Sequence, residues 1–169
     1  MKKELQVANY LVNAYERITD TRFEYSELML QKLMYFAQKT SLALTGKPLF
    51  HENFEGWIHG PVLKSLIGYF DTASPVVEED ALSETDKYII ENTIHSYGQF
   101  SAWKLRDMTH EEYSWKKSRE GLSNSEYGFE TILIDDIRKD AEKVHVFDHQ
   151  FDMYIDEFDD AEEEFRCIG

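Results

Sequence analysis

The sequence lacks the features of a secreted or membrane protein. Cys167 is its single cysteine, so no disulfide can form within the chain. No apolar run approaches the roughly 18 residues that a membrane-spanning helix needs. The first residues, Met-Lys-Lys-Glu-Leu-Gln, lack the apolar core of a signal peptide. These absences predict a soluble protein of the cytoplasm.

Basic residues are also scarce. The chain has 18 Lys and Arg residues against 33 Asp and Glu residues, a formal net charge of −15. The segment 140–169 alone has 11 acidic and two basic residues. So acidic a chain repels a phosphate backbone, and we expect no direct DNA binding. Two interpretations of the charge stay open: a solubility feature, or an acidic face for a basic partner.

Motifs of enzymes and metal sites are missing as well. The chain has no Gly-rich phosphate-binding loop, no nucleophile elbow and no His-Glu-x-x-His motif. Cys167 lies two residues from the end, a poor place for a preorganised nucleophile. His145 and His149 would share a helix face, but zinc sites usually need three or four ligands. We therefore predict a protein that is not an enzyme and has no metal or cofactor.

What is present indicates one helical domain. A chain of 169 residues with 42% hydrophobic and 14% aromatic residues can bury a substantial core. We predict a mainly α fold, a single compact domain of about six to eight helices. A short two-stranded β ribbon is predicted near residues 48–58, pairing 48–50 with 54–58. Residues 1–144 would form the helical domain, and 145–169 an acidic amphipathic C-terminal helix packed on it.

The central prediction is a buried helix that begins after Ser26 and ends near Gly46. Its residues Leu30 to Ala37 are apolar on nearly every side, as in helices that are buried all round. Gly46 suits a helix C-terminus, and Pro48 prevents continuation. Pro61 suits the first turn of a further short helix, predicted over 61–70.

Other helix boundaries follow from periodicity and capping residues. Helices are predicted over 4–18, after a capping box at Ser83 to Asp86, after Ser101, over 111–119, and after Asp135. From Ile137 to Phe165, apolar residues recur at steps of three and four, which fits one long helix or two joined near His145. The aromatic stripe of this tail packs on the domain, binds a partner or forms a homodimer.

Several blocks carry a family resemblance. Leu-Gln-Lys-Leu-Met-Tyr-Phe-Ala-Gln begins at Leu30, Ala-Leu-Thr-Gly-Lys-Pro-Leu-Phe at Ala43, and Glu-Gly-Trp-Ile-His-Gly-Pro-Val at Glu55. Thr109-His110 followed by Trp115 forms a separate block, preceded by Tyr97-Gly98. In order and spacing these blocks resemble the Panacea domain family of SocA-like antitoxins, common in phage and prophage genes, over roughly residues 5–144.

The resemblance implies a non-enzymatic antitoxin that neutralises a protein toxin by direct contact. Some members of the family deliver a toxin to a cytosolic protease, so inhibitor and protease adaptor both stay open. The alternative is a phage or prophage accessory protein that binds a host protein, acting as an acidic mimic of nucleic acid.

Six motif residues are candidates for partner binding, and each has a structural alternative. They are Lys32, Tyr35, Trp57, His59, His110 and Trp115. The alternative is that Gly60 and Pro61 set a turn, the tryptophans fill the core, and Thr109-His110 caps a helix. Lys32 is the sharpest case, because an ammonium on a buried helix must reach water, a carboxylate or a ligand.

Overall fold

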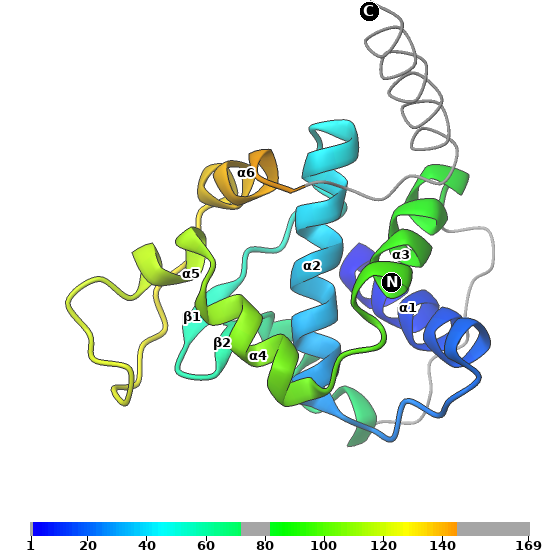
Figure 1. Cartoon of the computed structure of the whole chain (residues 1–169), viewed down its shortest axis with the longest axis horizontal. Helices are drawn as coiled ribbons and strands as arrows, with labels where there is room; N and C mark the ends of the chain where they lie inside the picture. Colours follow the sequence, from blue (N-terminus) through cyan, green and yellow to red (C-terminus); the bar gives the residue numbers. More distant parts are fainter. Residues whose placement is uncertain (1, 72–81, 145–169) are drawn as a thin grey trace, which may run out of the picture.

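The computed structural model describes residues 2–71 and 82–144, and in this part the chain is mainly helical (Figure 1). The elements are α1 (Lys3–Thr19), α2 (Glu27–Thr45), β1 (Glu55–Trp57), β2 (Gly60–Val62), the 3-10 helices η1 (Lys64–Leu66) and η2 (Tyr69–Asp71), α3 (Glu84–Tyr97), α4 (Ala102–His110), α5 (Tyr113–Ser118) and α6 (Ile134–Glu142). The predicted mainly α class with a small β ribbon is confirmed. No described helix is long and apolar enough to cross a bilayer.

Helix α2 is the element around which the fold is built. Every residue from Leu30 to Leu42 is buried, which confirms the predicted central helix. At its start the Ser26 hydroxyl accepts a hydrogen bond from the Met29 backbone N–H at 3.1 Å. At its end Gly46 has a φ of 74°, the left-handed angle that glycine adopts without strain. Both predicted ends of the helix are therefore correct.

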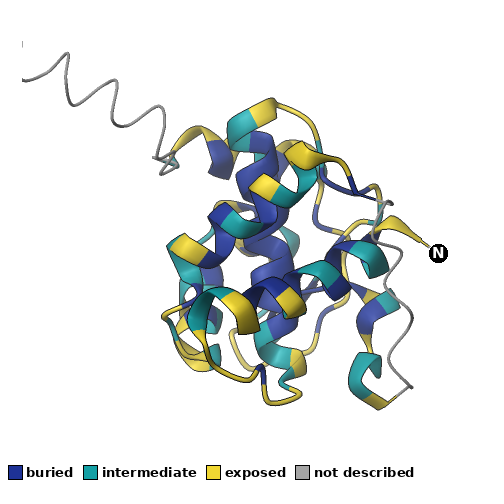
Figure 2. Cartoon of the chain, turned by 90° about the vertical axis from the view of Figure 1, so that its right-hand side faces the viewer, coloured by how far each residue is buried: buried dark blue, intermediate teal, exposed yellow. Residues whose placement is uncertain are grey.

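The other helices surround α2 on two sides. Helices α1 and α3 pack together and against it, on the right in Figure 1, and α4, α6 and β2 cover its other side. Figure 2 shows the buried residues gathered along α2 at the centre. The Phe36 ring stacks on Tyr97 of α3 with 4.1 Å between ring centroids. Because α2 is buried on every face, its side chains pack against helices from both the first and the second half of the chain.

The β ribbon lies further along the chain than predicted. Strand β1 pairs antiparallel with β2, with Trp57 opposite Gly60, so the predicted pairing with 48–50 is wrong. The predicted helix over 61–70 is also wrong, because β2 and two 3-10 turns occupy that segment. The Gln31 side chain, on α2, hydrogen-bonds both backbone groups of Leu63, at 2.8 and 2.9 Å. This contact with α2 holds the chain extended where local signals favoured a helix.

The remaining helix boundaries depend on local caps. The capping box of Ser83 with Asp86 and the cap by Ser101 are confirmed, and α1 matches the predicted first helix. The N-cap of α6 is Leu133, so the prediction for Asp135 is wrong, and this residue lies in the first turn. Helix α6 ends at Glu142, which excludes one continuous helix from 135 onwards. The predictions for 145–169, including His145 and His149, lie outside the described residues.

Candidate functional site

The buried lysine of α2 lies beneath the turn of the β hairpin. The Lys32 side chain is 1% exposed, and its Nζ atom donates a 2.9 Å hydrogen bond to the carbonyl oxygen of Pro61. Burial lowers the pKa of this amine to about 7, and the nearby Arg106 guanidinium lowers it further in the same direction. Lys32 therefore meets neither a carboxylate nor bulk solvent, the two partners expected for an isolated ammonium.

Gly60 allows this close approach. Its φ is +112°, and a Cβ atom there would lie 2.7 Å from Lys32 Cε and 2.7 Å from Thr109 Oγ1. A side chain at residue 60 would therefore collide with both α2 and α4. The Gly-Pro pair therefore has a structural role, because the absence of a side chain at Gly60 lets the hairpin turn pack directly on the buried lysine.

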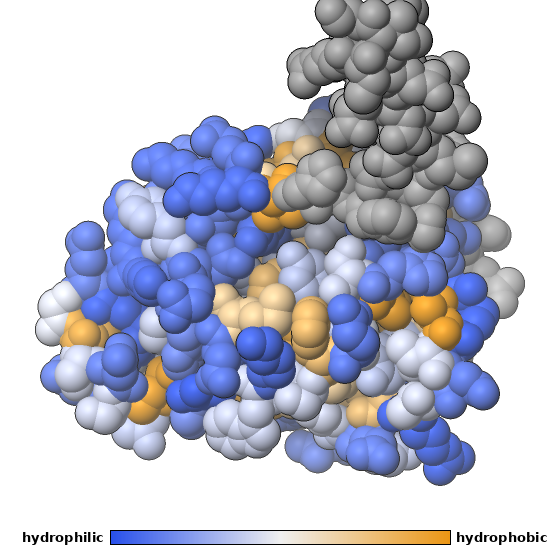
Figure 3. Space-filling model, in the orientation of Figure 1, coloured by the Kyte–Doolittle hydropathy of each residue, from blue (hydrophilic) through white to orange (hydrophobic). Residues whose placement is uncertain are grey.

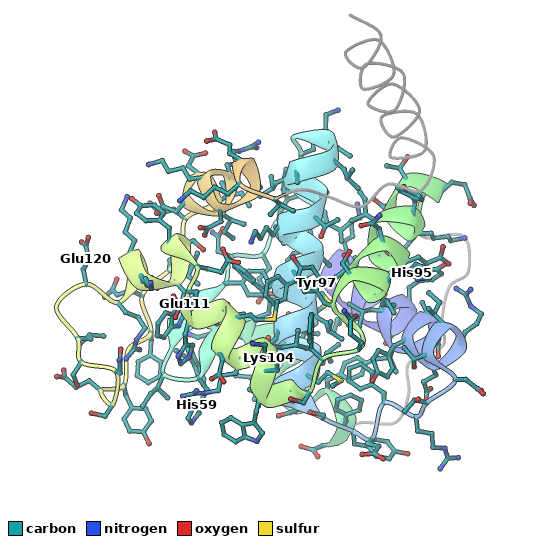
Figure 4. All side chains as sticks on the ribbon, viewed as in Figure 1. His59, His95, Tyr97, Lys104, Glu111 and Glu120 are labelled. Carbon is teal, nitrogen blue, oxygen red and sulfur yellow. The ribbon has the colours of Figure 1, made fainter. Side chains whose placement is uncertain are left out.

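An aromatic and cationic cluster lies on the surface beside the hairpin turn. We call His59, Trp103 and Arg106 the Trp103 cluster. The Arg106 Nε atom donates to His59 Nδ1 at 3.1 Å, and the Arg106 guanidinium lies 5.4 Å from the centroid of the Trp103 ring. The Trp103 side chain is 61% exposed, although it is large and apolar. The pKa of His59 is lowered, mainly by partial burial and to a smaller extent by the positive charges of Arg106 and Lys32. Figure 4 shows His59 beside α4.

A second ring pair connects α4 to α5. The rings of His110 and Trp115 stack with 4.0 Å between centroids and 8° between planes. The Trp115 Nε1 atom donates to the Trp57 carbonyl at 2.8 Å, which ties α5 to β1. The pKa of His110 is lowered to about 4, mainly by burial and to a smaller extent by the positive charges of Arg106 and Lys32. The imidazole is therefore neutral at pH 7, and its buried Nε2 atom has no hydrogen-bond partner within the described chain.

A buried carboxylate organises the other end of α5. Asp140 of α6 accepts hydrogen bonds from the backbone N–H groups of Tyr113 and Ser114, at 2.9 and 2.8 Å. The Tyr35 hydroxyl lies 2.7 Å from Ser114 Oγ and donates to Asp140 at 3.3 Å. The pKa of Tyr35 is raised well above its usual range, mainly by burial and to a smaller extent by the negative charges of Glu112 and Asp140. A carboxylate here satisfies the open N–H groups of the α5 N-terminus.

The six predicted partner-binding residues thus fall into two groups. Lys32, Tyr35 and Trp115 are 1%, 0% and 4% exposed, so no partner contacts them directly in this conformation. His59 is exposed, and Trp57 and His110 are partly exposed. The Trp57 indole donates to Glu55 at 3.0 Å and meets the exposed Phe129 ring edge-on at 5.2 Å. The buried three come from α2 and α5, whereas Trp57 and His59 belong to the hairpin and His110 ends α4.

Sequence reasoning missed residues that hold these elements in place. Gln38 repeats the role of Gln31, because its amide bonds the Phe50 carbonyl and the Leu49 N–H at 2.9 and 2.7 Å. Arg119 is buried and donates to the Gly56, Ser123 and Glu126 carbonyls, which fixes the loop after α5. The sequence did contain a signal for the two glutamines. A polar side chain inside a helix that is buried all round needs a hydrogen-bond partner, so Gln31 and Gln38 could have been expected to bond another segment.

Two surface pockets adjoin α5. One, of about 330 Å³, lies beside Lys39, Glu112 and Asp140, where Lys39 and Glu112 form an ion pair. The other, of about 470 Å³, lies between α4, α5 and the loop that follows. Its lining residues are Asp107, His110, Glu111, Trp115, Lys116 and Asn124. In the described ranges no three His, Cys, Asp or Glu side chains are arranged to hold a metal ion.

Comparison with known proteins identifies one family. The profile described as Antitoxin SocA-like, Panacea domain matches residues 30–116, just over half of the chain. The matched segment runs from α2 through the hairpin to α5, and so contains all six predicted partner-binding residues. No curated protein and no solved structure matches the chain.

Proposed function

The chain belongs to the Panacea-domain family of SocA-like antitoxins, and from this premise we propose that it neutralises a cognate protein toxin by direct contact. Membership of the family supports an antitoxin-type role with a protein partner. A binding role rather than catalysis also suits the buried amine of Lys32 and phenol of Tyr35, because both groups are enclosed by protein and have no access to a substrate.

The observation that carries the proposal is the exposed Trp103 cluster within the family segment. Tryptophan and arginine are the residue types that contribute most to protein interfaces, and both occur here with an exposed histidine. An indole that is 61% exposed leaves apolar area in water that a partner could cover. The face seen in Figure 3 is mostly hydrophilic, with apolar patches near its middle and at its right side. We therefore place the toxin contact on the hairpin turn and the first turns of α4.

The buried candidates would act through the surface ones. Lys32 holds the Pro61 carbonyl beneath the turn that presents His59. Trp115 holds the Trp57 backbone through its indole N–H. Under this proposal Lys32, Tyr35 and Trp115 are positioning residues, whereas Trp57, His59 and His110 are available for contact.

Co-expression tests the proposal. Each gene flanking that of this protein is expressed with and without it, and growth and a co-purifying complex are measured. We expect one neighbour to arrest growth and the wild-type chain to restore it. Trp103→Ala should weaken the complex at least tenfold, whereas the matched control Lys104→Ala, at the next exposed residue, should not. If no neighbour is toxic and no complex forms, the antitoxin proposal is wrong.

The same experiment separates inhibitor from adaptor. A simple inhibitor leaves the toxin intact in a stable complex. An adaptor lowers the amount of toxin, and deleting a cytosolic protease restores it. The alternative of a protein that binds a host factor as an acidic nucleic-acid mimic rests on the acidic segment 140–169 and stays a prediction.

A further inference from the structure

The Trp103 cluster offers hydrogen-bond donors and positive charge, although the chain as a whole has a net charge of −15. We propose that the cluster binds a carboxylate of the partner protein, from an Asp or Glu residue that lies beside an apolar side chain. The inference deepens the proposed function and rests on it for the identity of the partner. It follows from the hydrogen-bonding state of His59, Arg106 and Trp103.

The hydrogen bond from Arg106 fixes the tautomer of His59. A guanidinium nitrogen can only donate, so His59 Nδ1, which lies 3.1 Å from Arg106 Nε, must be the acceptor. The neutral imidazole therefore has its proton on Nε2. Partial burial and the cations Arg106 and Lys32 lower the pKa of the ring, which keeps it neutral at pH 7. Because the side chain is exposed, His59 offers an N–H donor to a ligand.

Two further donors of the cluster have no acceptor within residues 2–71 and 82–144. Arg106 uses Nε for His59 and Nη1 for Asp107, which leaves its Nη2 group. The Arg106 side chain is 22% exposed, and Nη2 does not belong to the described atoms that are buried without a partner, so it reaches solvent. The other donor is the indole N–H of Trp103, on a side chain that is 61% exposed.

A ligand of this cluster must therefore accept hydrogen bonds. The three side chains present N–H groups, and their one accepting atom, His59 Nδ1, is already used by Arg106. An ionised carboxylate only accepts, and its hydrogen bonds to a guanidinium are among the stronger ones in proteins. A lysine or arginine of the partner would find no acceptor among these three side chains.

The charge around the cluster also favours an anion. The charges that shift the pKa of His59, those of Arg106 and Lys32, are both positive. Trp103 is the second residue of the nine-residue helix α4, where open N–H groups add partial positive charge. Asp107 is the opposing charge, but it is 65% exposed, and its pair with Arg106 contributes little. Asp107 should therefore weaken binding of a carboxylate, and its removal should strengthen it.

A protein carboxylate suits this chain better than the phosphates of a nucleic acid. The net charge of −15 repels a polyanion along its whole length. A single carboxylate on a folded partner responds mainly to the charges within a Debye length, about 8 Å at physiological salt. An apolar side chain beside it can cover the exposed indole of Trp103, which supplies affinity, while the carboxylate supplies orientation.

A short peptide tests the site without the partner. The acetylated and amidated peptide Leu-Glu-Leu is titrated into the full-length chain, and the NMR signals of the Trp103 indole and the His59 ring are followed. The control peptide Leu-Gln-Leu has nearly the same shape and no charge. We expect saturable shifts with the Glu peptide and about fivefold weaker binding of the Gln peptide. Tighter binding of oligothymidylate than of the Glu peptide would assign the cluster to nucleic acid and overturn the proposal.

Substitutions on α4 sharpen this test. Arg106→Gln should weaken binding of the Glu peptide about fivefold, and Arg106→Lys, which keeps the charge but not the planar fork, about threefold. Asp107→Asn should strengthen binding about twofold, an effect that damage to the fold would not produce. Lys104→Gln removes an exposed cation of α4 outside the cluster (Figure 4) and should leave binding unchanged. Equal binding of both peptides, or equal effects of Arg106→Gln and Lys104→Gln, would overturn the proposal.

The tautomer of His59 gives a check that needs no ligand. Nitrogen NMR of the imidazole should show the proton on Nε2 in the wild type at pH 7. A proton on Nδ1 would mean that Arg106 does not donate to this ring, and the donor-only character of the cluster would be wrong.

Failure of this inference is distinguishable from failure of the proposed function. If the Glu peptide binds as expected but no neighbour is a toxin, the carboxylate site stands and the antitoxin proposal falls. If a toxin complex forms and Trp103→Ala weakens it, but the chain binds both peptides equally, the carboxylate site is wrong and the antitoxin proposal stands.

Discussion

The amine of Lys32 and the carbonyl oxygen of Pro61 lie 2.9 Å apart in the interior of the protein. The donor comes from the middle of α2, and the acceptor comes from β2, 29 residues later. Above them Gly60 leaves no space for a side chain. This one hydrogen bond therefore couples the central helix to the hairpin turn that presents His59.

The first prediction concerns the pH dependence of stability at Lys32. Its pKa is about 7 in the folded protein and 10.5 in the unfolded chain, so the unfolded chain binds more protons between these values. Stability due to this group should therefore rise with pH from 7 towards 10.5. Urea unfolding at pH 7 and pH 9 should show an increase on the order of 2 kcal/mol in the wild type that Lys32→Met lacks.

The control for this measurement is an exposed lysine. Lys64→Met, at a residue that pairs with Glu55 on the surface, should keep the wild-type pH slope. Equal slopes in the wild type and Lys32→Met would show that the buried amine does not titrate in this range.

The second prediction uses two glycines with positive φ. Gly60→Ala places a methyl group within 2.7 Å of Lys32 and Thr109, and should lower the free energy of unfolding by about 3 kcal/mol. Gly121→Ala also has an unfavourable φ, +84°, but its Cβ would meet open space. It should cost only about 1 kcal/mol. Similar costs in denaturant unfolding would mean that backbone strain alone, and not contact with α2, explains Gly60.

Local signals explain which parts of the fold could be predicted. Ser26, Ser83 and Ser101 act on N–H groups of their own helices, and Gly46 ends α2 by its own backbone angle, so sequence neighbours suffice. The hairpin could not be predicted in this way. Pro61 lies in a strand because Gln31, about 30 residues earlier, bonds the backbone of Leu63. Such a contact has no local signature.

The candidate site shows the same division. The motif drew attention to six residues, but which of them are buried could not be inferred from the motif. Lys32 meets a backbone carbonyl instead of water, a carboxylate or a ligand. Trp103, the most exposed of the tryptophans, lies in the family segment but in none of the motif blocks that carry the resemblance. Exposure depends on how α4 lies against the hairpin, and only the folded arrangement specifies this.

The third prediction is the titration of His110. Its pKa of about 4 means that the folded protein binds this proton less readily than the unfolded chain, whose value is 6.5. Stability due to His110 should therefore fall as the pH drops from 6.5 to 4. The NMR signal of the imidazole should stay that of a neutral ring at pH 5.5. A midpoint near 6.5 would contradict the burial of this ring against Trp115.

The fourth prediction concerns the carboxylate at the start of α5. The N–H groups of Tyr113 and Ser114 donate to different oxygens of Asp140, and Asp140→Asn replaces one of these oxygens by an NH₂ group, which then faces an N–H donor. Loss of the charge and of one acceptor should lower the free energy of unfolding by about 3 kcal/mol. Tyr35→Phe removes only the hydroxyl that lies between Ser114 and Asp140, and should cost about 1 kcal/mol.

Comparing these two variants decides what Asp140 does. If the carboxylate mainly supports the N-terminus of α5, Asp140→Asn is clearly the more harmful, and it also loosens Trp115, which lies two residues after Tyr113 on the same short helix. Trp115 fluorescence should then shift in the folded protein at pH 7. If both variants cost the same in urea unfolding, the Tyr35 hydroxyl is the important partner, and α5 depends on α2 rather than on α6.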